Sequence, residues 1–164
     1  MASNIVMTRV DARLVHGQVA TRWTKVTNAK AIAVVDDKTA KDEFLTEILY
    51  MASPVGVKVT VYTEEQAVEI WKGDGFGEQN TILLFQNVDT AKRCFDAGIN
   101  YESINIGQVP KAPGRRRANN TVQLSDDELE ELIDLDKHGV RVYFHPTPED
   151  LLTTLDTVVK RLKG

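Results

Sequence analysis

The chain has 164 residues, of which 42% are hydrophobic, so length and composition fit a single domain, residues 1–164, with an ordinary packed core. Its formal net charge of −4 argues against bulk attraction to nucleic acid or to an anionic membrane surface. The lone cysteine, Cys94, excludes an internal disulfide framework. We find no signal peptide and no apolar run near the roughly 20 residues that a membrane span needs, so we expect a cytoplasmic protein.

Short apolar runs alternate with helical patterns along the whole chain. The predicted strands, rich in Val and Ile, cover residues 4–8, 31–35, 57–62, 81–85, 103–106 and 140–144, with an extra edge strand at 121–124. The predicted helices cover residues 17–27, 41–52, 64–72, 89–97, 125–139 and 148–162. Such strands are buried on both faces of a parallel sheet. We therefore expect the α/β class: an open, doubly wound, mostly parallel β-sheet with helices on both faces.

Residues 8–19, TRVDARLVHGQV, place charged side chains between the first strand and the first helix. His16 stands at the start of that helix, where unpaired N–H groups and a partial positive charge favour an anion. Arg9 and Arg13 offer guanidinium forks that suit phosphate oxygens. Asp11 can accept one imidazole N–H and leave the other nitrogen as the nucleophile. The segment predicts a phosphohistidine site at the carboxyl end of the first strand.

The backbone around His16 completes this predicted site. Gly17 allows a close approach of the chain to an anion, and the N–H groups of Gly17 and Gln18 can point at it. An isolated histidine at a helix start is more simply explained by a bond to a backbone carbonyl. The cluster of Arg9, Asp11 and Arg13 favours a functional site, because such charges are expensive to bury without a partner or ligand.

Other strand ends carry candidate residues as well. Asp36 and Asp37 end the second strand and could hold Mg²⁺ as in a receiver domain, but a helix-capping turn is the favoured interpretation. His145 ends the last strand and is interpreted as a turn residue, although it could lie at the same sheet edge. The arginine-rich loop at residues 111–120 is interpreted as solvated surface.

Several enzyme classes lack their signals in this chain. We find no Walker motif, no zinc-ligand spacing and no serine elbow, so neither a nucleotide nor a metal cofactor is expected. Two rival functions stay open. One is a hydrolase that forms phosphohistidine, although its usual Arg-His-Gly order is absent because Val15 precedes His16. The other is a receiver-type signalling module that uses Asp36 and Asp37.

Residues 9–20, RVDARLVHGQVA, followed by Trp23, closely resemble the signature of enzyme IIB of the mannose/fructose/sorbose class of the bacterial phosphoenolpyruvate-dependent sugar phosphotransferase system (PTS). The resemblance continues at residues 104–107, 124–128 and 137–140 and covers nearly the whole chain. It implies that His16 accepts a phosphoryl group on Nδ1 from enzyme IIA, that Arg13 steadies that group and that Asp11 sets the local geometry.

The same resemblance implies partners and a location. The phosphoryl group would pass to a sugar held by the membrane components IIC and IID, which would bring the protein to the inner face of the membrane. A homodimer is possible, and both a hexose and an amino sugar such as N-acetylgalactosamine stay open. The chain departs from the family pattern at residues 144–148, FHPTP, and at the arginines 115–117, neither of which touches the phosphorylation motif.

Overall fold

The computed structural model describes residues 4–164, except the side chain of Gln18. Its centre is a seven-stranded sheet in which all strands are parallel except the last, two-residue strand. In spatial order the strands are β3 (Lys58–Tyr62), β2 (Ala31–Val35), β4 (Asn80–Phe85), β1 (Asn4–Asp11), β5 (Ser103–Gln108), β8 (Arg141–Phe144) and β9 (Thr153–Thr154). The expected α/β class with a mostly parallel sheet is confirmed.

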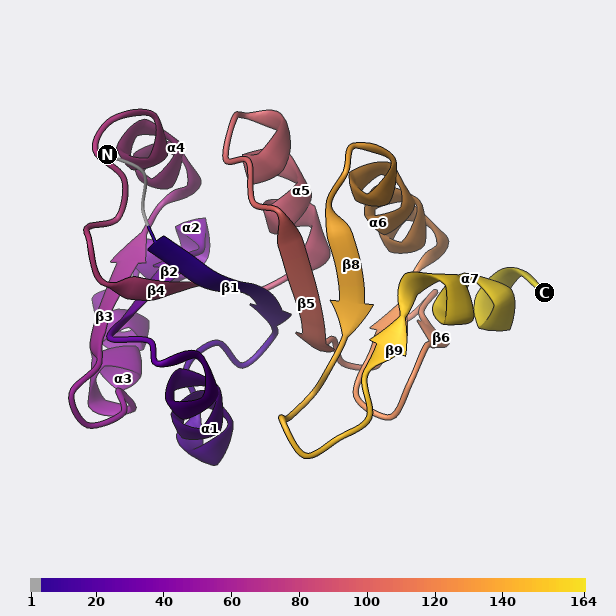
Figure 1. Cartoon of the computed structure of the whole chain (residues 1–164), viewed down its shortest axis with the longest axis horizontal. Helices are drawn as coiled ribbons and strands as arrows, with labels where there is room; N and C mark the ends of the chain where they lie inside the picture. The colour runs from indigo at the N-terminus through magenta and orange to yellow at the C-terminus, as the bar shows by residue number, and fades with distance from the viewer. Residues whose placement is uncertain (1–3) are drawn as a thin grey trace.

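Helices cover both faces of this sheet (Figure 1). One face carries α1 (Gly17–Thr27) and α3 (Glu43–Met51), whose Trp23 and Leu49 are buried against it. The other face carries α4 (Glu64–Lys72), α5 (Val88–Asp96), α6 (Asp126–Lys137) and α7 (Leu155–Lys163). Since the helix after β1 lies on one face and the helices after β4 and β5 lie on the other, the direction of winding changes at β1. Ligands of such folds bind beyond the carboxyl ends of strands at this kind of switch point.

Two observed helices begin at later residues than predicted, because capping residues within the predicted ranges set their first turns. The helix predicted at 41–52 is preceded by a separate short helix, α2 (Asp37–Ala40), and Asp42 caps α3 by accepting from Phe44 and Leu45 N–H. The helix predicted at 148–162 begins only at Leu155, because Thr154 caps it and residues 153–154 pair with β8. In the described residues no helix is long and apolar enough to cross a membrane.

The region at residues 111–124 corrects two further expectations. The strand predicted at 121–124 reaches the edge of the main sheet only through a single parallel bridge between Val122 and Val109, the residue after β5. Its end, β7 (Gln123–Leu124), pairs with β6 (Arg116–Arg117) as a separate antiparallel pair. The arginine loop is solvated only in part, because the Arg115 guanidinium donates to both carboxylate oxygens of Glu128 at 3.0 and 2.8 Å. That Glu128 side chain is only 7% exposed, so the loop is fastened to α6 by a charged pair.

Candidate functional site

The predicted site lies at the carboxyl end of β1, the strand that sits between β4 and β5. After Asp11 the chain turns sharply: Leu14 has a positive φ of 57° and donates its N–H to the Asp11 carbonyl at 2.9 Å. The side chains of Leu14 and Val15 are buried in the core under α1. These two buried apolar side chains anchor the loop to the core. The side chains of Arg13 and His16, on the same loop, face the surface.

His16 and Asp11 form the centre of the site. The imidazole Nε2 lies 3.0 Å from Asp11 Oδ2, while Oδ1 accepts the backbone N–H of Arg13 at 3.0 Å. The Asp11 side chain is 1% exposed, whereas that of His16 is 20% exposed. Burial alone raises the pKa of Asp11, but the hydrogen bond from His16 and the charge of Arg9 outweigh it and lower that pKa. An ionised Asp11 only accepts hydrogen bonds, so Nε2 is the donor, and in the neutral ring the lone pair is on Nδ1.

The start of α1 differs from the start of every other helix in the described residues. The other six helices each begin with a side chain that caps a backbone N–H and carry an acidic residue in their first turn. The N-cap of α1 is His16, whose side chain makes no capping bond, and its first turn has no acidic residue. This end of α1 therefore keeps free donors and its partial positive charge beside the imidazole, which favours an anion there.

Arg13 sits where an incoming anion can reach it. Its side chain is 57% exposed, and its Nε lies 4.0 Å from Asp11 Oδ1, at the limit of an ion pair. Such a loose contact leaves the guanidinium donors available for oxygen atoms outside the protein. The expected role of Arg13 as a phosphoryl ligand fits this placement.

Arg9 is placed differently from the sequence expectation of a phosphate ligand. The strand predicted to end at Thr8 continues to Asp11, so Arg9 and Asp11, two residues apart, point to the same face under α1. The Arg9 side chain is 5% exposed and donates to the carbonyls of His145 and Pro146, each at 2.9 Å, and to Asp11 at 3.2 Å. Burial lowers its pKa from the ordinary value, against the opposing effect of Asp11. These contacts place Arg9 in the interior beneath the site, where its guanidinium is bonded to oxygens of the protein itself, and its expected contact with a phosphate stays a prediction.

Gly17 and Gln18 open α1, as expected. Gly17 has a φ of +40°, and a Cβ on it would meet no protein atom within 4 Å. The glycine therefore serves the left-handed backbone conformation at this position, and its expected close approach to an anion stays a prediction. The Gln18 backbone belongs to the first turn of α1, while its side chain lies outside the described part of the chain.

The other candidates serve local structure. Asp36 caps α2 by accepting from the Thr39 N–H and hydroxyl, and Asp37 accepts the Glu64 N–H at 2.8 Å. No group of three potential metal ligands occurs in the described residues, and β4 separates the Asp36 strand from β1. The favoured capping interpretation of these carboxylates is therefore confirmed.

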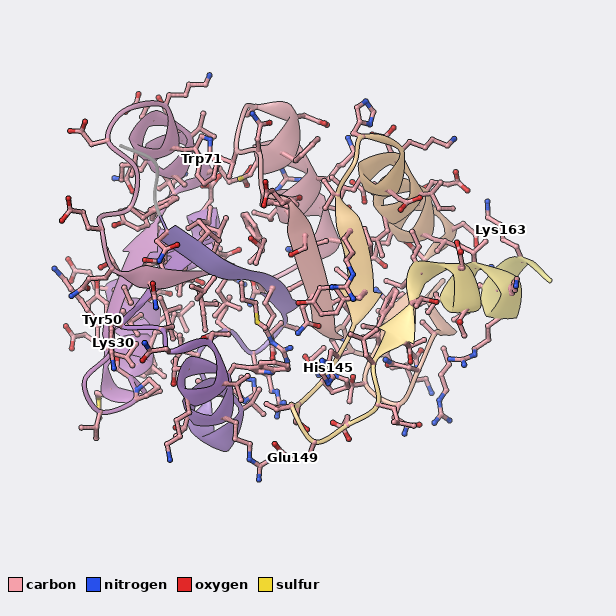
Figure 2. All side chains as sticks on the ribbon, viewed as in Figure 1. Lys30, Tyr50, Trp71, His145, Glu149 and Lys163 are labelled. Carbon is pink, nitrogen blue, oxygen red and sulfur yellow. The ribbon has the colours of Figure 1, made fainter. Side chains whose placement is uncertain are left out.

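His145, labelled in Figure 2, follows β8 at the sheet edge where β1 also ends, because β1, β5 and β8 run parallel. Its Nε2 contacts the Asp150 carbonyl at 2.9 Å, and its ring packs edge-on against Trp23 at 5.1 Å. The same indole donates to the Pro146 carbonyl at 3.1 Å, and Arg22 pairs with Glu149, so the segment after β8 rests on α1.

Sequence reasoning missed two residues of this region, Asn105 and Gly107. Asn105 is fully buried, lies opposite Arg9 in the β1–β5 pairing and accepts the His145 N–H at 3.0 Å. A Cβ on Gly107 would overlap the guanidinium of Arg9. Both lie in the segment 104–107, where a polar residue and a glycine interrupt an apolar strand. A glycine inside a strand indicates that another part of the chain packs closely against it, so this feature could have been recognised from the sequence.

The fold and site define an open α/β protein that presents a histidine–aspartate pair beside an uncapped helix N-terminus. The sequence matches the family "PTS system sorbose subfamily IIB component" over residues 5–163. The chain belongs to this family of phosphotransferase-system IIB components.

Individual relatives agree with this assignment. The crystal structure of manxB from Thermoanaerobacter tengcongensis has a TM-score of 0.92 and 41% identity, covering 97% of this chain and 96% of that one. The sorbose-specific EIIB component of Klebsiella pneumoniae is 33% identical over 138 residues, 84% of each protein. The mannose-specific EIIAB component of Escherichia coli (strain K12) is 31% identical over 157 residues, 95% of this chain and 49% of that protein. This chain thus spans about half the length of its EIIAB relatives.

Proposed function

We propose that this protein is a phosphocarrier of sugar uptake whose single IIB domain accepts a phosphoryl group on Nδ1 of His16 and passes it to a sugar. The observation that carries the proposal is the pairing of Nε2 with Asp11 at 3.0 Å beside the uncapped start of α1. That pairing directs the lone pair of Nδ1 away from Asp11, and the free N–H groups of α1 suit the charge of a phosphoryl group.

The first transfer follows from this geometry. The Nδ1 lone pair attacks phosphorus on a phosphohistidine of the donor; the new N–P bond forms as the donor's N–P bond breaks and its electron pair returns to the donor imidazole. Asp11 stabilises the positive charge that develops on the His16 ring. Arg13 and the first N–H groups of α1 stabilise the charge on the equatorial phosphoryl oxygens.

The second transfer runs through the same atom. A sugar hydroxyl oxygen attacks phosphorus and releases its proton to water, and the N–P bond to His16 breaks with its electron pair returning to Nδ1. The reaction makes the protein a protein-Nπ-phosphohistidine–sugar phosphotransferase that needs no cofactor. Two different macromolecules must reach the same ring, and the surface position of His16 and Arg13 supports such access.

Membership of the family supports a proposal for the partners. The proposed donor is enzyme IIA, which the name EIIAB joins to IIB in the Escherichia coli relative. The proposed acceptor is a sugar bound to the membrane components IIC and IID, which would hold this cytoplasmic protein at the inner face of the membrane. A homodimer is the further proposed assembly, and the exposed side chains of Phe44 and Met51 on α3 give it an apolar surface to bury.

The test is phosphate transfer from labelled phosphoenolpyruvate through purified Enzyme I, HPr and a matching IIA. Wild-type protein is expected to take up acid-labile label, and His16→Ala is expected to take up none. His138→Ala is the matched control, because His138 lies at the exposed end of α6, where its Nδ1 contacts the Asp134 carbonyl. Label on His16→Ala, or acid-stable label on wild type, would overturn the assignment.

The hydrolase rival is decided in the same experiment. A phosphocarrier keeps its label in water until an acceptor arrives, whereas a hydrolase releases inorganic phosphate continuously. Rapid phosphate release by wild type, absent from His16→Ala, would favour the hydrolase.

A further inference from the structure

Arg9 is buried beneath the site and makes three side-chain hydrogen bonds. It donates through Nη1 to the His145 carbonyl and through Nη2 to the Pro146 carbonyl and to Asp11 Oδ2, the oxygen that also faces His16 Nε2. Its guanidinium carbon lies 5.6 Å from the ring centre of Trp23. One buried cation therefore touches the carboxylate that orients the histidine and two successive carbonyls that lie 136 and 137 residues further along the chain.

Strand β5 builds the slot that holds this guanidinium. The β1–β5 pairing runs from Arg9 opposite Asn105 to Asp11 opposite Gln108, and its register shifts between Val10 and Asp11. Gly107 is passed over in that shift, and a Cβ there would overlap Cζ and both terminal nitrogens of Arg9. The missing side chain of Gly107 is what gives the guanidinium its room.

The Asp11 carboxylate is held from three sides as a result. Oδ1 accepts the Arg13 N–H, and Oδ2 lies between the Arg9 guanidinium and His16 Nε2. A carboxylate that is 1% exposed needs a compensating charge, and Arg9 is the buried cation in contact with it. With that charge in place Asp11 stays ionised as a pure acceptor, which requires the proton of the neutral imidazole to sit on Nε2.

We propose that Arg9, seated in the slot left by Gly107, is a positioning residue that fixes the Nε2–H tautomer of His16 through Asp11. The inference rests on the proposed function in one respect, namely that Nδ1 is the proposed phosphate acceptor. The tautomer itself is a property of the unphosphorylated protein and can be measured there. Arg9 touches no reacting atom; it acts through the carboxylate, as outer partners of histidine ligands do in other sites.

The test uses four variants that separate charge, shape and stability. Arg9→Met removes the cation, and Arg9→Lys keeps a charge without the planar fork. Gly107→Ala leaves Arg9 in the chain but displaces its guanidinium from the slot. Arg93→Gln is the matched control, because it removes an exposed arginine that pairs with Glu64 on the far side of the sheet from α1.

The primary readout is the tautomer of His16 by nitrogen-15 NMR, with its signals assigned by their loss in His16→Ala. In wild type and Arg93→Gln we expect the Nε2–H form alone. In Arg9→Met and Gly107→Ala we expect the Nδ1–H form to rise to at least its fraction in the urea-unfolded chain, with partial recovery in Arg9→Lys. The rate of phosphorylation by IIA should fall about tenfold or more in the first two variants.

A purely structural Arg9 predicts a different pattern. If folded Gly107→Ala and Arg9→Lys both keep the wild-type tautomer, the proposal is wrong, even when their stability falls. If Arg9→Met does not fold, those two variants decide. A wild type with a pure Nε2–H tautomer that takes up no phosphate would refute the proposed function and leave this inference standing.

Discussion

Removing the Asp11 carboxylate should destabilise the protein far more than removing an exposed acid. Arg9 and Asp11 are 3.2 Å apart with side chains 5% and 1% exposed, and at an effective dielectric constant of about 20 their attraction is about 5 kcal/mol. Asp11→Ala also removes the cost of burying the carboxylate, so the net loss is smaller. Breaking a buried pair on one side costs about 3–5 kcal/mol, and since two carbonyls still accept from Arg9, we expect about 3 kcal/mol.

Urea unfolding followed by circular dichroism measures this loss. Asp126→Ala is the matched control, because it breaks the exposed pair with Arg116, whose side chains are 52% and 83% exposed, and should cost less than about 1 kcal/mol. The double variant Arg9→Met/Asp11→Ala should recover part of the loss, since it no longer buries a lone cation. A loss for Asp11→Ala no larger than that of the control would refute the reasoning.

Three further predictions concern single groups. Burial alone raises the pKa of Asp11, but the hydrogen bond from His16 and the nearby guanidinium outweigh burial and lower that pKa in the folded protein. The stabilising effect is therefore fully present above the ordinary pKa of an unfolded aspartate, about 4, and is lost as the pH falls through the lowered pKa of the folded state. Asp11→Asn should flatten this acid limb of stability in urea titrations at successive pH values. Burial raises the pKa of Cys94 to about 12, so a thiol reagent at pH 8 should react only as the protein unfolds; fast reaction of folded protein would contradict this. Glu128→Gln weakens the pair with Arg115 at a side chain 7% exposed and should lower the free energy of unfolding by about 2 kcal/mol; a loss near zero would show a solvated pair.

The sequence allowed the sheet and the centre of the site to be predicted, because both depend on local patterns. Continuous Val and Ile runs mark strands buried on both faces, and the change from strand to helix period around residues 8–19 placed His16 at a helix start. The pairing of His16 with Asp11 was also predictable, because the two residues are five apart on one tight turn.

Contacts between distant segments could not be predicted in the same way. The place of Arg9 depends on β1 reaching Asp11, on the gap left by Gly107 and on carbonyls at residues 145–146, none of which a local pattern specifies. The Arg115–Glu128 pair has the same origin, since a run of three arginines is ordinarily solvated. The late start of α7 depends on the pairing of Thr153 and Thr154 with β8, which competes with helix formation.

The hydrogen bonds from Arg9 to the carbonyls of His145 and Pro146 also affect when, during synthesis and folding, the site is complete. Arg9 lies in the phosphorylation motif, but the carbonyls that receive its guanidinium follow 136 and 137 residues later in the chain. A nascent chain therefore carries His16, the proposed phosphate acceptor, at a strand end whose surroundings are incomplete until residues 145–146 have been synthesised. Such a dependence on far-separated segments slows folding and delays completion of the surroundings of His16 until the last parallel strand has docked.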